Sequence, residues 1–156
     1  MAEAEQILDN CGQQKRGEVS VSVMGKTGRR VLIVDDMPSI LTDATELIGD
    51  RYELETAASG KEAVEKVKSF KPDIVLMDMH MPDMNGITCM EIIHGEEGFK
   101  DLPIIMTMND VSVITKARSY DHGAVDSLQK PFIKLNLFRK IDMHLKLKEI
   151  GWHFEL

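Results

Sequence analysis

Short apolar runs alternate with longer amphipathic stretches along the chain from Val31 onward. The runs Val31–Val34 and Ile74–Met77 are continuously apolar, which is typical of strands that are buried on both faces. Three further segments, 52–57, 103–108 and 125–129, also have the length and pattern of strands. Apolar residues at helical intervals predict the helices between them, over 38–48, from 59 onward, and over 87–94, 112–122 and 135–150.

Five predicted strands, each followed by a predicted helix, indicate βαβ units with right-handed crossovers. The expected fold is therefore an α/β, doubly wound parallel sheet with helices on both faces. Ligands of such folds bind beyond the carboxyl ends of the strands, near the point where the strand order reverses. Asp35 and Asp36 follow the first predicted strand and Asp78 follows the third, so we expect an acidic cluster at that edge.

Three carboxylates at neighbouring strand ends would repel one another. Such repulsion raises the pKa of at least one carboxyl group unless a cation is present. Mg²⁺ is a suitable cation, since it binds one or two carboxylates together with waters and a phosphate. Taken singly, Asp35 is explained as a helix cap and Asp78 as a solvated strand end. Taken with Lys130, which follows the fifth predicted strand, the three acids favour a binding site.

Composition narrows the class of protein but not its chemistry. The chain has 156 residues and a formal net charge of −7, which fits one acidic domain. Its apolar runs are too short to span a bilayer, and the acidic start does not resemble a secretory signal. Cys11 and Cys89 form neither a disulfide framework nor a metal-binding pair by their spacing. We therefore expect a cytoplasmic domain with no membrane partner and no direct nucleic-acid binding.

Four motifs occur in the order found in receiver domains of two-component response regulators. They are Val31–Asp36, the element Asp-x-x-Met-Pro-x-Met-x-Gly over 78–86, Gly123-Ala124, and Lys130–Phe132. Residues 31–149 resemble this family, whose fold is the flavodoxin-like arrangement with strand order 2-1-3-4-5. The resemblance divides the chain into an N-terminal extension (1–28), a receiver domain (29–150) and a C-terminal tail (151–156).

The resemblance also implies a role for each matching site residue. Asp78 corresponds to the phosphoacceptor, which forms an acyl phosphate and also contacts Mg²⁺. Asp36 corresponds to a direct Mg²⁺ ligand, Asp35 to a direct or water-mediated ligand, and His80 to a residue that offers its backbone carbonyl. Lys130 corresponds to the cation that pairs with the phosphoryl group, and the bond that follows it is often cis in this family.

Two positions depart from the family pattern. Receivers usually have Ser or Thr at the end of the fourth strand, where gapless counting places Met108, with Thr107 one residue earlier. A one-residue slip turns a strand side chain to the opposite face. Either a local gap or bulge shifts the strand end and brings Thr107 into the site, which we favour, or the site lacks the hydroxyl. The aromatic residue usual three positions before the lysine is replaced by Ser127.

The function implied by the resemblance is a phosphorylation-controlled signalling module. A sensor histidine kinase or a phosphotransfer protein would supply the phosphoryl group, and an unidentified protein would be the downstream target. We expect a monomer or a homodimer that catalyses no reaction beyond its own phosphorylation and dephosphorylation. The rival class is a phosphohydrolase of the haloacid-dehalogenase type, which would require Asp at the position of His80.

Some features stay open at this point. Residues 1–28 suit either a mobile segment or an added edge strand, since 19–23 alternates in polarity. The chain fits either a stand-alone regulator or one domain of a longer protein. His94, His122, His144 and His153 lack metal-ligand spacing, and we expect them at the surface.

Overall fold

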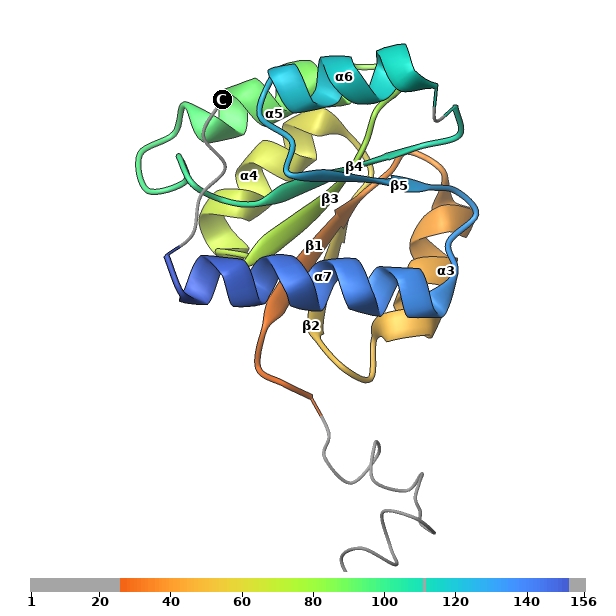
Figure 1. Cartoon of the computed structure of the whole chain (residues 1–156), viewed down its shortest axis with the longest axis vertical. Helices are drawn as coiled ribbons and strands as arrows, with labels where there is room; N and C mark the ends of the chain where they lie inside the picture. The colour runs from red at the N-terminus through yellow and green to blue at the C-terminus, as the bar shows by residue number, and fades with distance from the viewer. Residues whose placement is uncertain (1–25, 111, 152–156) are drawn as a thin grey trace, which may run out of the picture.

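Strands and helices alternate through the part of the chain that the computed structural model describes, residues 26–110 and 112–151 (Figure 1). The strands are β1 (Arg30–Val34), β2 (Glu53–Ala57), β3 (Ile74–Asp78), β4 (Ile104–Met108) and β5 (Asp126–Gln129). The helices are α3 (Pro38–Ile48), α4 (Gly60–Phe70), α5 (Gly86–His94), α6 (Val113–Asp121) and α7 (Lys134–Glu149). All strand pairs are parallel and the order in the sheet is β2-β1-β3-β4-β5, which confirms the predicted fold.

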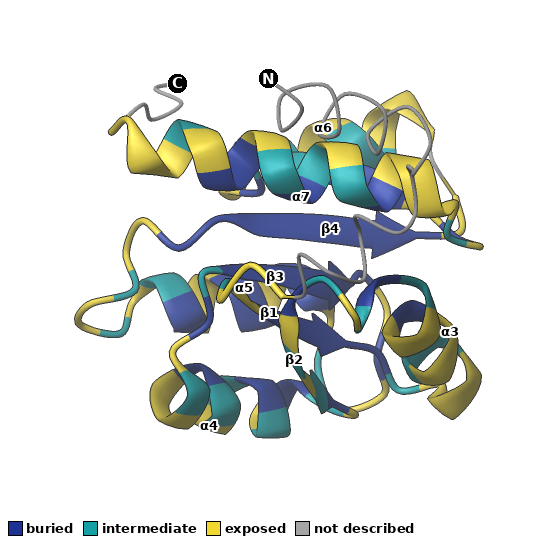
Figure 2. Ribbon diagram, turned by 90° about the horizontal axis from the view of Figure 1, so that it is seen from below, coloured by how far each residue is buried: buried dark blue, intermediate teal, exposed yellow. Residues whose placement is uncertain are grey.

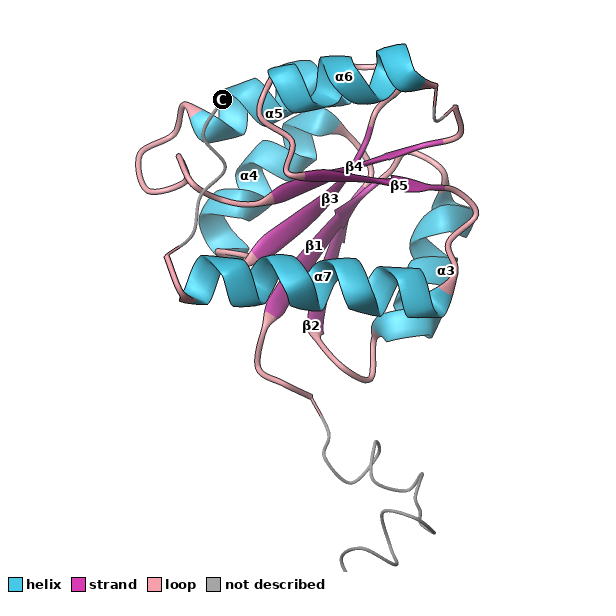
Figure 3. Cartoon of the chain, in the orientation of Figure 1, coloured by secondary structure: helices cyan, strands magenta, loops and turns pink. Residues whose placement is uncertain are grey.

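Alternate residues of each central strand pack into two separate apolar clusters. Val31 and Ile33 of β1 join the cluster that includes α3 and α7 residues, whereas Leu32 and Val34 join the cluster that includes α4 and α5 residues. Helices therefore flank the sheet on both sides (Figure 3). The strands are mostly buried, and exposed residues lie mainly on the outer sides of the helices (Figure 2). A continuously apolar strand is what this two-sided packing requires.

The start of α4 shows how local sequence sets an element boundary. The Ser59 hydroxyl accepts a hydrogen bond from the N–H of Glu62 at 3.1 Å, so Ser59 is the side-chain cap of this helix. The Glu62 carboxylate in turn accepts from the N–H of Ala58 at 2.8 Å, one residue before the cap. The first bond satisfies a backbone donor that the helix itself leaves without a partner, and the second ties the residue before the cap to the first turn of α4.

His144 corrects one expectation from the sequence. We expected it at the surface, but only 3% of its side chain is exposed. It lies on the inner side of α7, seven residues after the buried Leu137 and three after the buried Ile141. His122 is exposed, and His94 is half-buried.

Two other expectations concern residues outside the described ranges. The strand expected near 19–23 and the location of His153 lie there. Within the described ranges, no helix combines the length and the apolar character needed to cross a membrane.

Candidate phosphoacceptor site

The acidic cluster consists of Asp35, Asp36 and Asp78, and the fold brings all three together. β1 and β3 are neighbours in the sheet, with Val34 paired to Met77, so the residues that follow meet at one edge. One carboxylate oxygen from each aspartate lies within 4.8 Å of the other two. From this edge the chain turns to α3 on one face and to α5 on the other, which makes it the switch point where such folds bind ligands.

Lys130 connects two members of the acidic cluster. Its ammonium donates to Asp35 Oδ2 at 2.9 Å and to Asp78 Oδ1 at 3.0 Å, and the three side chains are nearly fully buried. Burial lowers the pKa of Lys130, but its bonds to the two carboxylates outweigh that effect and raise it. The lysine therefore stays charged inside the site.

The charged form of Asp78 is disfavoured, because the pKa of its carboxyl group is raised above the ordinary value. Burial raises its pKa, and the nearby Asp35 raises it further, although Lys130 partly opposes both effects. The N–H of His80 also donates to Asp78 Oδ1, over a long distance of 3.4 Å. A second cation beside Asp78 would remove this penalty.

The donor set of the acidic cluster fits Mg²⁺. Three carboxylates face one ammonium, so the described part of the site carries more negative than positive charge. Hard divalent cations prefer such oxygen ligands. Asp35 does not act as the side-chain cap of α3, since that helix begins after Met37 without one. Its second oxygen instead accepts from the N–H of Met37 at 2.9 Å, which holds the carboxylate in place.

The described ladder between β3 and β4 is regular up to its end and contains no bulge. Thr107 pairs directly with Asp78 in the register of β3 and β4. Met106 and Met108 pack into the cluster that contains α5 residues, whereas Ile105 packs into that of α3 and α7. By strand alternation, Thr107 therefore projects from the same face as Asp78. Met108 projects from the opposite face.

Thr107 is almost fully buried, with 2% of its surface exposed. Within the described ranges, its hydroxyl makes no hydrogen bond. A buried hydroxyl without a partner is unfavourable and is uncommon away from functional sites. The contact of Thr107 with a phosphoryl group stays a prediction.

A tyrosine that the sequence analysis did not single out lies beside Ser127. The Tyr120 hydroxyl of α6 is 3.1 Å from the Ser127 hydroxyl of β5. Tyr120 also packs against the cluster that contains Met108. An aromatic ring is thus present near this position, but it comes from the helix instead of the strand. Its place seven residues before Ser127 is not a recognisable motif, so sequence alone gave no signal.

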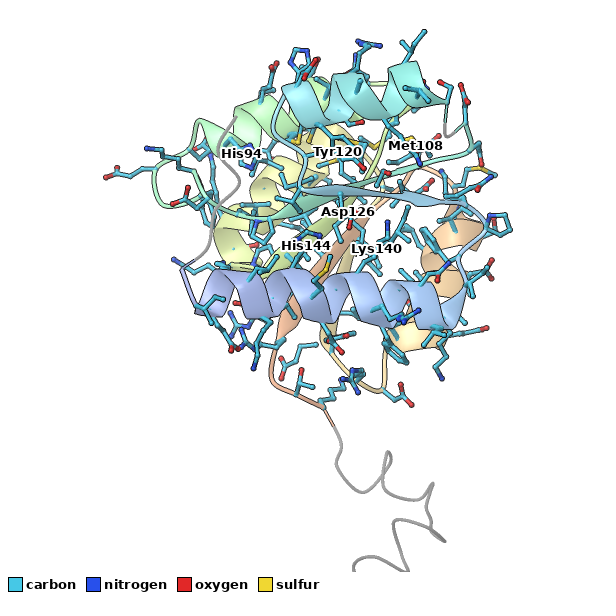
Figure 4. All side chains as sticks on the ribbon, in the orientation of Figure 1. His94, Met108, Tyr120, Asp126, Lys140 and His144 are labelled. Carbon is cyan, nitrogen blue, oxygen red and sulfur yellow. The ribbon has the colours of Figure 1, made fainter. Side chains whose placement is uncertain are left out.

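A second charged group, the Asp126 cluster, joins β5 to α7. It consists of Asp126, Lys140 and His144, whose side chains lie between the strand and the helix (Figure 4). Lys140 donates to Asp126 Oδ1 at 2.9 Å, and His144 Nε2 lies 3.0 Å from Asp126 Oδ2. Burial alone would raise the pKa of Asp126, but the bonds from His144 and Lys140 outweigh it and lower the pKa to about 2.

Comparison with known proteins identifies the family. The family model for the response regulator receiver domain matches residues 31–142, which is 112 of the 156 residues. The chain belongs to the response regulator receiver domain family, whose members are signalling modules of two-component systems. The Lys130–Pro131 bond is cis, as the resemblance implied.

Relatives and solved structures agree with this assignment. The chain is 29% identical over 122 residues to the DNA-binding response regulator MtrA of Mycolicibacterium smegmatis, covering 78% of this chain and 52% of MtrA. It is 38% identical over 122 residues to a protein-glutamate methylesterase/protein-glutamine glutaminase of Methanococcus maripaludis, covering 72% and 32%. The chain thus spans about half or less of the length of these relatives.

A solved receiver-domain structure superposes on most of this chain. The CheY-like response regulator receiver domain protein of Methanospirillum hungatei is 29% identical and superposes with a TM-score of 0.72. The match covers 79% of this chain and 98% of that one.

Proposed function

We propose that this chain is a phosphorylation-controlled switch in which Asp78 accepts a phosphoryl group in a Mg²⁺-dependent reaction. The observation that carries the proposal is the buried Lys130, bonded to both Asp35 and Asp78 beside an excess of carboxylates. A sensor histidine kinase or a phosphotransfer protein would donate the group, and the product would change contacts with an unidentified protein target. We assign this role to residues 29–150.

The chemistry follows from the charges at the site. A carboxylate oxygen of Asp78 attacks phosphorus, and the bond between phosphorus and the donor's imidazole nitrogen breaks, with its electron pair leaving on the nitrogen. Lys130 lies where it would neutralise negative charge on the transferred group. Asp35, Asp36, Asp78 and the His80 carbonyl would hold Mg²⁺, which supplies further charge neutralisation when bound.

Thr107 is the proposed hydroxyl donor to the phosphoryl group. Its pairing with Asp78 and its unpartnered, buried hydroxyl support this role. Thr107→Val keeps the shape of the side chain and removes only the hydroxyl. We expect slower phosphorylation with a melting temperature close to that of the wild type. An unchanged rate would refute the role of this hydroxyl.

Intact mass measurement tests the proposal directly. The full chain is incubated with Mg²⁺ and acetyl phosphate, beside Asp78→Asn and a control, Asp50→Asn, at an exposed position. We expect the wild type and the control to gain the mass of one phosphoryl group and Asp78→Asn to gain none. Equal gain by Asp78→Asn would refute the assigned acceptor. A cytoplasmic location stays a prediction from the sequence.

A further inference from the structure

The loop between β3 and α5 (residues 79–85) is held in place both where it joins α5 and near its tip. The ends are joined because the N–H of Gly86 donates to the carbonyl oxygen of Met79 at 2.7 Å. Near the tip, the Asp83 carboxylate accepts from the N–H of Gly60 at 3.1 Å and from that of Lys61 at 3.0 Å. These amides begin α4, where the helix offers its own N–H groups no partner.

An apolar contact reinforces this anchor. Met84 lies against the backbone of Gly60, and a Cβ atom at Gly60 would come within 2.4 Å of Met84 Cγ. Only glycine at this buried position lets the methionine approach so closely. The two N–H bonds, that of Gly60 first, also lower the pKa of Asp83, which favours its charged form.

The start of α4 already has its own cap, so Asp83 is not needed to begin the helix. Ser59 accepts from the N–H of Glu62, and Glu62 accepts from the N–H of Ala58. Asp83 comes from a different segment and accepts from two other amides. Its contribution therefore falls mainly on the loop.

We propose that Asp83 is a positioning residue for the Mg²⁺ site. His80 lies between Met79, which is bonded to Gly86, and Asp83, which is bonded to the start of α4. The His80 N–H donates to Asp78 Oδ1. By holding the loop on α4, Asp83 fixes the backbone carbonyl of His80 in one position before the ion binds. A ligand that is already ordered loses less conformational freedom on binding, so it binds the ion more tightly. This inference rests on the Mg²⁺ site proposed above.

Two variants at the start of α4 separate this role from general stability. Asp83→Ala removes the anchor of the loop, whereas Ser59→Ala removes the helix's own cap and leaves the loop anchored. Mg²⁺ affinity of the full chain is measured by isothermal titration calorimetry, with melting temperatures recorded without metal. We expect Asp83→Ala to weaken Mg²⁺ binding about tenfold, as is typical for groups that orient metal ligands. Ser59→Ala should leave the affinity within about twofold, since it does not touch the loop.

A conservative variant and a metal-free readout sharpen the test. Asp83→Asn keeps one acceptor oxygen, so we expect it to restore part of the affinity lost in Asp83→Ala. In metal-free protein, hydrogen exchange at the Gly86 amide should be faster in Asp83→Ala than in Ser59→Ala. This readout reports the closure of the loop.

The outcomes distinguish this inference from the proposed function. Equal Mg²⁺ affinities for Asp83→Ala and Ser59→Ala, beside a wild type that binds Mg²⁺, would overturn the positioning role alone. A wild type that does not bind Mg²⁺ would overturn both the metal site and the role of Asp83.

Discussion

The acidic cluster and the Asp126 cluster both contain charged groups that are buried or half-buried, but their charges balance differently. In the acidic cluster three carboxylates face one lysine, and the pKa of Asp78 is raised, with burial as the largest cause. In the Asp126 cluster one carboxylate has two basic partners, and its pKa is lowered to about 2. The first group is short of positive charge, whereas the second supplies its own.

This difference distinguishes a candidate ligand-binding site, the acidic cluster, from a structural ion-pair cluster, the Asp126 cluster. A buried charge is tolerated when partners and hydrogen bonds compensate for the lost hydration. The Asp126 cluster meets that condition with protein groups alone, so it serves to hold α7 on β5. The acidic cluster would meet it fully only with a further cation, and its incomplete compensation is what suits it to a ligand.

The largest expected effect is on protein stability when the Asp126 cluster is disrupted. Asp126→Ala leaves Lys140 and His144 without this carboxylate, and we expect the free energy of unfolding to fall by about 3 kcal/mol. Asp78→Asn without Mg²⁺ should instead leave stability unchanged or slightly raised, because it removes a charge that burial disfavours. Urea unfolding of the metal-free proteins measures both. Equal losses in the two variants would remove the distinction between the clusters.

Mg²⁺ should act on the acidic cluster alone. An ion that binds only the native state stabilises it by about 2.7 kcal/mol at one hundred times its dissociation constant. For a chain of this size we expect a melting temperature higher by roughly 5–10 °C. Asp36→Ala should abolish this rise, whereas Asp126→Asn should retain it from a lower baseline. A Mg²⁺ response that survives in Asp36→Ala would refute the assigned ligand.

Lowering the pH should reduce the stability contributed by the Asp126 cluster and remove the unfavourable charge of Asp78 in the acidic cluster. The lowered pKa of Asp126 means that its stabilisation is complete above about pH 4 and is lost as the pH falls towards about 2. The amount is about 2 kcal/mol. The contribution of Asp78 to stability has the opposite sign. Because its pKa is raised, protonation at lower pH removes an unfavourable buried charge and stabilises the native state.

Urea unfolding at several acid pH values measures these opposing contributions. Asp126→Asn should show a shallower loss of stability in acid than the wild type, and Asp78→Asn a steeper one. Parallel pH profiles for all three proteins would contradict both assignments.

The smallest effect is expected at the contact between α6 and β5. Tyr120→Phe removes one hydrogen bond to Ser127, outside both clusters, and should lower the free energy of unfolding by about 1 kcal/mol. Ser127→Ala should have a similar effect, and the double variant should lose little more than either single variant. Additive losses in a double-mutant cycle would show that the two hydroxyls do not interact.

Much of the acidic cluster could be predicted from the sequence because strand ends are easy to locate. Asp35, Asp36 and Asp78 follow strands whose apolar runs are plain, and parallel strands place their carboxyl ends at one edge. Lys130 was found by its motif, and its distances to Asp35 and Asp78 then agreed with that expectation.

Other contacts depend on how distant elements pack, and local patterns do not reveal them. Asp83 reaches amides 22 and 23 residues earlier in the chain, and Tyr120 meets Ser127 only because α6 folds back over β5. The expectation of an exposed His144 was wrong for a different reason. Its spacing from Leu137 and Ile141 places it on the inner side of α7, although histidine is a polar residue type.

The geometry of Lys130 explains why a lysine suits this position better than an arginine. An ammonium has three N–H donors directed towards the corners of a tetrahedron, and Asp35 and Asp78 take two of them. In the described part of the site no third acceptor contacts it. The third N–H of Lys130 could therefore donate a hydrogen bond to an arriving oxyanion while the other two stay bonded to Asp35 and Asp78. A guanidinium directs its five donors into one plane, so it is less suited to partners that are placed around a single point.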